Sequence, residues 1–244
     1  MTVYTGTLSR FELPKNMLVV GASQSGKTHF LKKLLTHNEE MFTPHVSKIV
    51  YCFSVWQEKY EQLEHALGDL IEFRTDIPTK DELVQNWQDN RSETLLVLDD
   101  KMACLEDNAQ GRAVVEIATV LCHHCHVSLI ITLQNMYHAS KAVREIGLNS
   151  QYICLFKNNR SVGQVRTLAS QTMPTDIAFF MASYDLATTP NYGYLVVDLS
   201  SNIDKKFQLK SYIFQMSSPH FTSPKNESGQ EKYYFSPGCS LPTR

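Results

Sequence analysis

A glycine-rich segment, GASQSGKT, occupies residues 21–28 and has the composition of a phosphate-binding loop. Its glycines allow the backbone to turn successive N–H groups toward phosphate oxygens, which requires unusual torsions and close approach. The lysine would reach the β- and γ-phosphates of ATP, and the threonine hydroxyl after it would ligate Mg²⁺. We therefore expect ATP to be bound by Gly21, Ala22, Ser23, Gln24, Ser25, Gly26, Lys27 and Thr28.

Two adjacent carboxylates, Asp99 and Asp100, end the apolar run TLLVLDD at residues 94–100. Like charges repel at this distance, so paired acids at the end of a buried strand indicate a cation nearby. Asp99 suits the acid that holds Mg²⁺ with Thr28, and Asp100 suits a general base that polarises the attacking water. A solvated acidic turn before Lys101 is the alternative. With the glycine-rich loop, the pair predicts an enzyme that hydrolyses ATP.

A side-chain amide, Gln134, follows the strand-like run VSLIIT of residues 127–132. At the carboxyl end of a strand beside the acidic strand, it would orient water or sense the γ-phosphate. Amide side chains also commonly turn loops, and that alternative stays open.

Strand-like apolar runs alternate with segments of helical period along most of the chain. This order predicts an α/β fold with a mainly parallel sheet and helices on both faces. Together with the glycine-rich loop, it points to a P-loop NTPase fold of the RecA-like kind. We expect strands at residues 17–20, 48–53, 70–74, 94–98, 127–132 and 152–156, and helices at residues 27–37, 57–67, 80–89, 110–122, 161–170 and 175–185. Residues 194–199 and 207–214 predict a C-terminal β-hairpin added to the sheet. We place the ATPase domain at residues 1–216 and a mobile tail at residues 217–244, where Ser, Pro, Lys and Gly dominate.

The overall charge limits the partners of the protein. A formal net charge of −2 and a pI of about 6.5 argue against a protein that coats DNA, but a motor that contacts DNA with a few loops needs only local positive charge. Six cysteines without framework spacing suit a reducing compartment. The chain has no apolar run of about 18 residues and no signal-peptide pattern. We expect a soluble, intracellular protein that has no membrane partner.

Several blocks together resemble the FtsK–HerA class of P-loop ATPases, and more closely the poxvirus-type genome-packaging ATPases. They are GASQSGKT, KIVYCFSVWQEKY, TLLVLDD, HHCHVSLIITLQNMYH, VREIGLNSQYICLFKNNRS and YGYLVVDL, which span about residues 15 to 215. The pattern is most similar to the versions found in Polinton (Maverick) elements, adintoviruses and virophages. Many relatives in the wider class carry Asp-Glu at this position. This chain carries Asp99-Asp100, the pair that also occurs in the poxvirus-type relatives.

This resemblance implies a ring-forming homo-oligomer that uses ATP to pump double-stranded DNA into a preformed capsid. A portal or vertex protein of the capsid is the implied partner. Sites of virion assembly in the host nucleus or cytoplasm are the implied location, with association with the virion as a further option.

The resemblance also implies that an arginine from a neighbouring subunit completes each site. Arg144 and Arg160 are the candidates, because both lie in the block that follows Gln134, and Arg112 is a third. Each could instead be a surface ion-pair partner.

Other functions and ligands remain to be compared. The closest alternative is a helicase or a conjugation-type ATPase, and a scaffold that only binds nucleotide is another. A nucleoside kinase is disfavoured because residues 100–160 show no arginine-rich lid, and a GTPase because the guanine-reading Asn-Lys-x-Asp motif is absent.

The cluster CHHCH at residues 122–126 has poor spacing for zinc, since adjacent side chains point apart. We expect Trp56, Tyr60 and Trp87 to pack in the core or at its rim rather than to form a binding surface.

Overall fold

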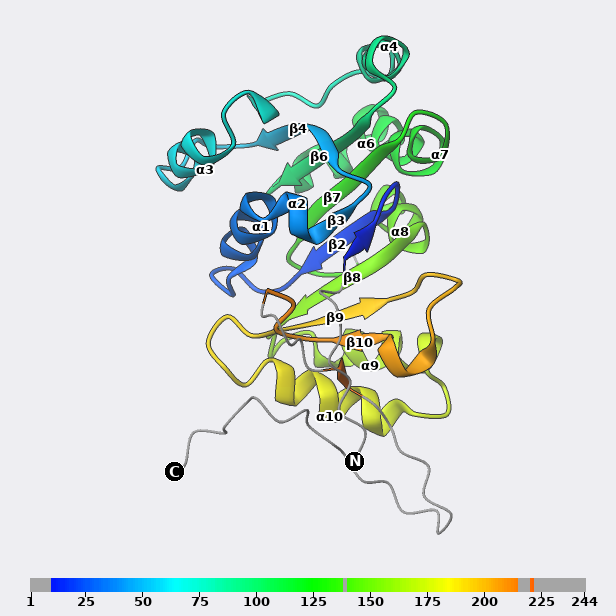
Figure 1. Ribbon diagram of the computed structural model, residues 1–244. Helices are drawn as coiled ribbons and strands as arrows, with labels where there is room; N and C mark the ends of the chain where they lie inside the picture. The colour runs from blue at the N-terminus through cyan, green and yellow to red at the C-terminus, as the bar shows by residue number, and fades with distance from the viewer. Residues whose placement is uncertain (1–9, 138–139, 215–219, 222–244) are drawn as a thin grey trace.

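A nine-stranded sheet in the order β11-β10-β9-β8-β2-β7-β6-β4-β5 runs through the centre of the protein (Figure 1). The computed structural model describes residues 10–137, 140–214 and 220–221. Six strands pair in parallel: β2 (Asn16–Val20), β4 (Val46–Phe53), β5 (Ile71–Arg74), β6 (Glu93–Asp99), β7 (Val127–Leu133) and β8 (Ser150–Phe156). Three strands add to the β8 edge in antiparallel fashion: β9 (Tyr194–Asp198), β10 (Leu209–Lys210) and β11 (His220–Phe221). The predicted fold class is confirmed.

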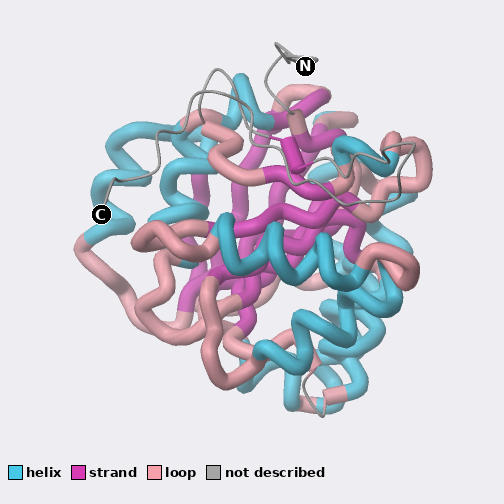
Figure 2. Tube along the Cα trace, turned by 90° about the horizontal axis from the view of Figure 1, so that it is seen from below, coloured by secondary structure: helices cyan, strands magenta, loops and turns pink. Residues whose placement is uncertain are grey.

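Helices cover both faces of the sheet, as the sequence predicted (Figure 2). One face packs against α1 (Lys27–Thr36), α2 (Asn38–Met41) and α3 (Lys59–Leu67). The other packs against α4 (Lys80–Asn90), α5 (Met102–Glu106), α6 (Asn108–Glu116), α8 (Lys141–Leu148), α9 (Val162–Thr172) and α10 (Ile177–Ala187). The strands are apolar on both faces, so each face must be covered. In strand β2, Met17 and Val19 pack into the core on the α1 side of the sheet, while Leu18 and Val20 pack into the core on the opposite side. A strand buried on both faces reads as a continuous apolar run.

The expected helix at residues 110–122 is interrupted. It begins earlier, because the Asp107 carboxylate caps α6 by accepting hydrogen bonds from the N–H groups of Ala109 and Gln110. A π-helical turn (Ile117–Leu121) then separates α6 from α7 (Cys122–His124). Two further short elements escaped the sequence pattern, namely α5 and a two-stranded parallel sheet of β1 (Phe11–Glu12) and β3 (Phe42–Thr43). Short 3₁₀ turns occupy Gly68–Leu70 and Lys205–Phe207.

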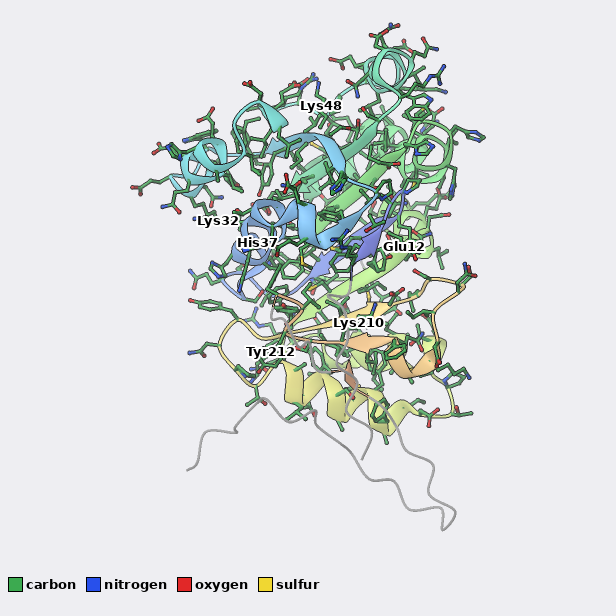
Figure 3. The ribbon with its side chains drawn as sticks, viewed as in Figure 1. Glu12, Lys32, His37, Lys48, Lys210 and Tyr212 are labelled. Atoms are coloured by element: carbon green, nitrogen blue, oxygen red, sulfur yellow. The ribbon has the colours of Figure 1, made fainter. Side chains whose placement is uncertain are left out.

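The C-terminal hairpin exists, but its second strand is shorter than residues 207–214. Only Leu209–Lys210 pair with β9. A buried ion pair between the two strands joins Lys210 Nζ to the Asp198 carboxylate at 2.8 Å, and Figure 3 shows Lys210 on this added edge, with Lys48 toward the opposite edge. Two residues of the expected tail, His220–Phe221, form a strand on β10, whereas residues 217–219 and 222–244 of that tail lie outside the described residues. None of the helices in the described part of the chain is long and apolar enough to cross a bilayer.

Candidate nucleotide site

The glycine-rich loop joins the end of β2 to the start of α1, and its two glycines have separate structural reasons. The Gly21 N–H donates to Leu133 O at 3.0 Å, which ties the loop to β7. A Cβ atom on Gly21 would lie 2.5 Å from Phe156 Cβ, so no larger residue fits against β8. Gly26 has a φ of +106°, in the left-handed region that favours glycine. The sequence spacing of the glycines therefore reflects both close packing and backbone torsion.

The first turn of α1 presents unpaired hydrogen-bond donors at the loop. Among the described residues, no side chain caps this helix, so its first N–H groups stay available to a ligand. The Ser25 hydroxyl is buried and also has no hydrogen-bond partner in the part of the chain that the structure describes. Buried polar atoms normally find a partner, and an anion at a helix N-terminus would supply one. The loop therefore fits a nucleotide phosphate.

Lys27 folds back onto the loop that it ends. Its ammonium group donates to the carbonyl oxygens of Gly21 at 2.7 Å and Ala22 at 2.8 Å. Burial lowers the pKa of Lys27 below its usual range, and the nearby charges of Asp99 and Asp100 oppose this shift. The lysine and both acids thus belong to one electrostatic cluster, as the sequence motifs predicted.

Asp99 is held at the end of β6 by three hydroxyl groups. Its Oδ2 accepts hydrogen bonds from Tyr51 Oη at 2.7 Å and Tyr60 Oη at 3.2 Å, and its Oδ1 accepts one from Thr132 Oγ1 at 2.9 Å. Only 4% of Asp99 is exposed. Burial, reinforced by the charge of Asp99, raises the pKa of both tyrosines, so both remain protonated donors. An ionised carboxylate offers about four acceptor sites, so this arrangement leaves about one of them for a cation or its water.

Asp100 is held by its backbone, not by its carboxylate. Its N–H donates to Thr132 Oγ1 at 2.9 Å, and its carbonyl oxygen accepts from Ser54 Oγ at 2.7 Å. The residue is exposed and has a φ of +56°. Within the described ranges, the carboxylate itself forms no hydrogen bond, so it is free to bind water. Thr132 therefore links the two acids, donating to one and accepting from the other.

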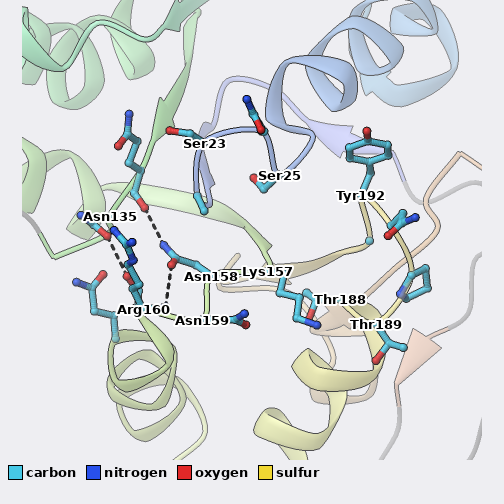
Figure 4. Close-up of a pocket in the computed structure, with 18 residues that line it drawn as sticks. Ser23, Ser25, Asn135, Lys157, Asn158, Asn159, Arg160, Thr188, Thr189 and Tyr192 are labelled. Atoms are coloured by element: carbon cyan, nitrogen blue, oxygen red, sulfur yellow. Dashed lines mark hydrogen bonds between the residues drawn. The ribbon is translucent and has the colours of Figure 1, made fainter.

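A large pocket opens beside the loop, with a volume of about 1010 Å³ (Figure 4). Among the described residues that line it, two are cations, Lys157 and Arg160, and none is an acid. The rest are mostly amide and hydroxyl side chains, drawn from the glycine-rich loop, from residues 134–135, from the turn that follows β8, from Gln164 on α9, and from residues 188–193. A polar pocket with positive charge suits a polyanionic ligand.

The predicted residues divide between two neighbouring regions. Gln134 and Arg160 line the pocket with Ala22, Ser23, Gln24 and Ser25, whereas Asp99 and Asp100 lie on the β6 side of the loop. Figure 4 shows Arg160 beside Asn158, whose amide donates to Gln134 O at 3.2 Å and whose Oδ1 accepts from the Arg160 N–H at 3.1 Å. Arg144 is an exposed residue of α8 and does not line this pocket. Arg112 is exposed on α6 and donates to Asn108 O.

Several site residues carry no signal in the sequence pattern. Thr132, Tyr51 and Tyr60 look like ordinary strand and helix residues in the sequence, yet their hydroxyls hold the Asp99 carboxylate. Asn158 and Tyr192 reach the pocket from loops far along the chain. Of these, only Asn158 follows a recognisable buried strand, and polar residues at that edge of a parallel sheet are candidates for ligand contact.

The strand order defines the class of the protein. Strand β7, which ends just before Gln134, lies between the phosphate-loop strand β2 and the acidic strand β6. The protein is a P-loop NTPase of the kind expected for the FtsK–HerA class, with a mainly parallel sheet and an added strand between the two nucleotide motifs.

The chain belongs to the Poxvirus A32 protein family, whose model matches residues 8–169. The expected resemblance is confirmed, and the protein is a genome-packaging ATPase of the poxvirus type. The fold is similar to that of the genome packaging NTPase B204 from Sulfolobus turreted icosahedral virus 2 in complex with ATPγS, with 16% identity, a TM-score of 0.51, and coverage of 81% of this chain and 96% of that one.

A second structure, B204, the DNA-packaging ATPase from Sulfolobus turreted icosahedral virus, is 13% identical with a TM-score of 0.52. That alignment covers 82% of this chain and 98% of the other. A search of curated protein sequences found no match.

Proposed function

We propose that the protein is a ring-forming, ATP-driven translocase that moves double-stranded DNA into a capsid. One observation carries this proposal: the glycine-rich loop, its lysine, a pinned acid and a free acid meet in one cluster beside a polar, positively charged pocket. Such a cluster performs phosphoryl transfer to water mainly through positioning and electrostatic stabilisation. The B204 proteins, which this chain resembles in fold, are a genome packaging NTPase and a DNA-packaging ATPase.

Each residue of the loop has a defined task in this scheme. The unpaired N–H groups at the start of α1 and the Ser25 hydroxyl bind phosphate oxygens. Lys27 exchanges the carbonyl oxygens of Gly21 and Ala22 for the β- and γ-phosphates, which keeps its ammonium group paired in both states. Thr28 and Asp99 would hold Mg²⁺. An ion held there would supply positive charge that offsets the negative charge of the phosphates.

The two acids have different roles because their surroundings differ. Asp99 is buried and fixed by three hydroxyl groups, which suits a group that must hold one position through many turnovers. The exposed carboxylate of Asp100 accepts a proton from the attacking water. Thr132 fixes the two acids relative to each other, since its single hydroxyl donates to the Asp99 carboxylate and accepts from the Asp100 N–H. Gln134, at the end of the same strand, orients that water.

The two candidate arginines also differ in position. Arg160 lines the pocket of its own subunit, where it would contact the nucleotide bound there. Arg144 is exposed on α8 and lies outside that pocket, so it is the better placed to enter the site of a neighbouring subunit. We assign the trans role to Arg144, and a role within the same subunit to Arg160.

A translocase and a helicase differ in what they do to duplex DNA. A duplex translocase strips a third strand from a triplex without separating the duplex beneath it, whereas a helicase separates a forked duplex. We expect ATP-dependent triplex displacement by the full chain, no fork unwinding, and loss of displacement in Lys27→Ala. Fork unwinding would replace the packaging motor with a helicase.

Mixed subunits test the ring and the arginine assignment. Lys27→Ala still offers its arginines to a neighbour, and Arg144→Ala still binds ATP in its own site. Mixing these two inactive proteins should restore hydrolysis, because an arginine finger contributes about 10³- to 10⁵-fold in turnover. Arg160→Ala mixed with Lys27→Ala should give no comparable rescue. Rescue by Arg160→Ala alone would reverse the assignment, and full activity of a dilute monomer would refute the ring.

Ring assembly, delivery of DNA through a capsid portal or vertex protein, and action at sites of virion assembly complete the proposal.

A further inference from the structure

Tyr192 is an exposed aromatic residue in a conformation that side chains seldom adopt. It lies in the loop between α10 and β9, with 63% of its surface exposed and a φ of +60°. The next residue allows no side chain, because a Cβ atom on Gly193 would lie 2.3 Å from Ala187 O. Residues held in the left-handed region are concentrated at ligand clamps and active sites, where the surrounding structure enforces them. The loop therefore fixes an aromatic ring where burial does not require one.

The ring lies against the phosphate-binding loop. A Cβ atom on Gly26 would lie 2.9 Å from Tyr192 Cδ1, so the ring packs directly over this glycine. Its centroid is also 6.3 Å from the imidazole of His29, in the first turn of α1. Figure 4 shows Tyr192 at the edge of the pocket near Ser25, on a different segment from Lys157 and Arg160. The ring thus borders the site where the helix N-terminus would bind phosphates.

The chemistry of the pocket leaves one surface for a nucleobase. Phosphates fill the loop itself, so the nucleoside must extend into the remainder of the pocket. Among the described residues that line this pocket, Tyr192 is the one aromatic side chain, and nearly all the others are amides, hydroxyls or cations. Flat heteroaromatic bases bind well by stacking on an aromatic face, and stacking tolerates different bases because each has a π-face.

We propose that Tyr192 is the platform on which the nucleobase of the bound nucleotide stacks. This inference rests on the proposed ATPase site, and it adds the residue that distinguishes a nucleoside triphosphate from a bare polyphosphate. The amide of Asn191 lies in the same loop and can donate or accept hydrogen bonds at the edge of the base. The Thr189 hydroxyl donates to Asp185 O at 2.7 Å and can still accept a hydrogen bond there.

Tripolyphosphate separates base recognition from phosphate recognition, because it has the charge of the nucleotide tail without the base. We would measure the binding of ATP and of tripolyphosphate by calorimetry for the full chain and for Tyr192→Ala. The variant should bind ATP about five- to a hundredfold more weakly, in line with the cost of removing one stacking partner. Its affinity for tripolyphosphate should not change. Tyr192→Phe keeps the ring and should bind ATP as the unmodified protein does.

Tyr137→Ala is the matched control, because Tyr137 is also exposed but lies outside the pocket lining, with its hydroxyl bonded to Gln171 at 2.9 Å. This variant should bind both ligands normally. Equal weakening of both ligands by Tyr192→Ala would mean that the ring only supports the loop, and unchanged ATP binding would mean that it does not contact the base. Either result overturns the inference. Failure of the unmodified protein to bind either ligand would instead overturn the ATPase site itself.

Discussion

The hydrogen bonds that Asp99 accepts should contribute measurably to the free energy of unfolding, even when no nucleotide is bound. Tyr51→Phe removes the shortest of the three contacts, the 2.7 Å hydrogen bond to Asp99 Oδ2. Tyr51 is fully buried, and phenylalanine has nearly the same shape, so the change removes a hydrogen bond without opening a cavity.

The charge of the acceptor sets the size of the effect. A hydrogen bond to a charged group contributes about 1.5–3 kcal/mol, against about 0.5–1.5 kcal/mol for a neutral acceptor. We therefore expect Tyr51→Phe to lower the free energy of unfolding by about 1.5–3 kcal/mol. In a chain of this size that corresponds to a fall in Tm of about 3 to 12 °C. Tyr60→Phe should cost less, because its contact with Asp99 is longer at 3.2 Å.

Urea unfolding of the nucleotide-free protein provides the assay, with a double-mutant cycle between Tyr51→Phe and Asp99→Asn. The comparison variant is Tyr184→Phe, because Tyr184 is also buried and its hydroxyl has only neutral partners: it donates to Phe156 O at 3.1 Å and accepts from the Asn158 N–H at 3.1 Å. The tyrosine change should cost about 1 kcal/mol less in the Asp99→Asn background, where the acceptor is neutral. Tyr184→Phe should show no coupling to Asp99→Asn, because Tyr184 does not contact Asp99. Additive effects of Tyr51→Phe and Asp99→Asn would refute the proposed role of the tyrosine hydroxyl in holding Asp99.

Further predictions concern the acids, the loop and a buried thiol. Asp99→Asn should weaken Mg²⁺-dependent nucleotide binding, whereas Asp100→Asn should bind ATP nearly normally and hydrolyse it slowly, and exchanged phenotypes in binding and turnover assays would exchange their roles. Gly26→Ala should destabilise the protein by about 1–3 kcal/mol in thermal melting and weaken ATP binding, because φ is positive there and the new Cβ would lie 2.9 Å from Tyr192. Burial, with a smaller contribution from the charge of Glu93, raises the pKa of Cys122 to about 11 from an ordinary value of 9.0. The folded protein therefore holds this proton longer than the unfolded chain, and the stability that results is lost as pH rises through that interval. Cys122→Ala should remove a slope of about 1.4 kcal/mol per pH unit from urea titrations between these values, and identical slopes in both proteins would contradict the shift.

Local spacing in the sequence indicates those parts of the candidate site that directly follow an apolar run. The glycine-rich loop, Lys27 and the acid pair follow apolar runs directly, and the structure places them together. The parallel sheet followed from the alternation of strand-like and helical segments, because such connections allow few topologies. Gln134 also lies at the expected strand end and lines the pocket.

Contacts that depend on strand register could not be predicted in the same way. Thr132 meets Asp99 because β6 and β7 are neighbours in a particular register, with Leu98 opposite Ile131. Tyr60 reaches the same carboxylate from α3, across a separation of 39 residues. Tyr192 lines the pocket from a loop, TTPNYG, whose composition indicates only a turn. Two-residue strands such as β11 are too short for any periodicity, so the sheet extends further toward the C-terminus than the pattern indicated.

The central claim is that this loop and acid pair hydrolyse ATP in a motor that acts on duplex DNA. The most direct measurement is the steady-state rate of ATP hydrolysis by the full chain, with and without long duplex DNA, compared with Lys27→Ala. Lys80→Ala serves as the control, since that lysine lies at the start of α4, outside the glycine-rich loop and α8, with 51% of its side chain in solvent. We predict hydrolysis that duplex DNA stimulates, that Lys27→Ala abolishes in both conditions, and that Lys80→Ala leaves intact. Normal turnover by a folded Lys27→Ala protein, or a rate that duplex DNA does not change, would contradict the account.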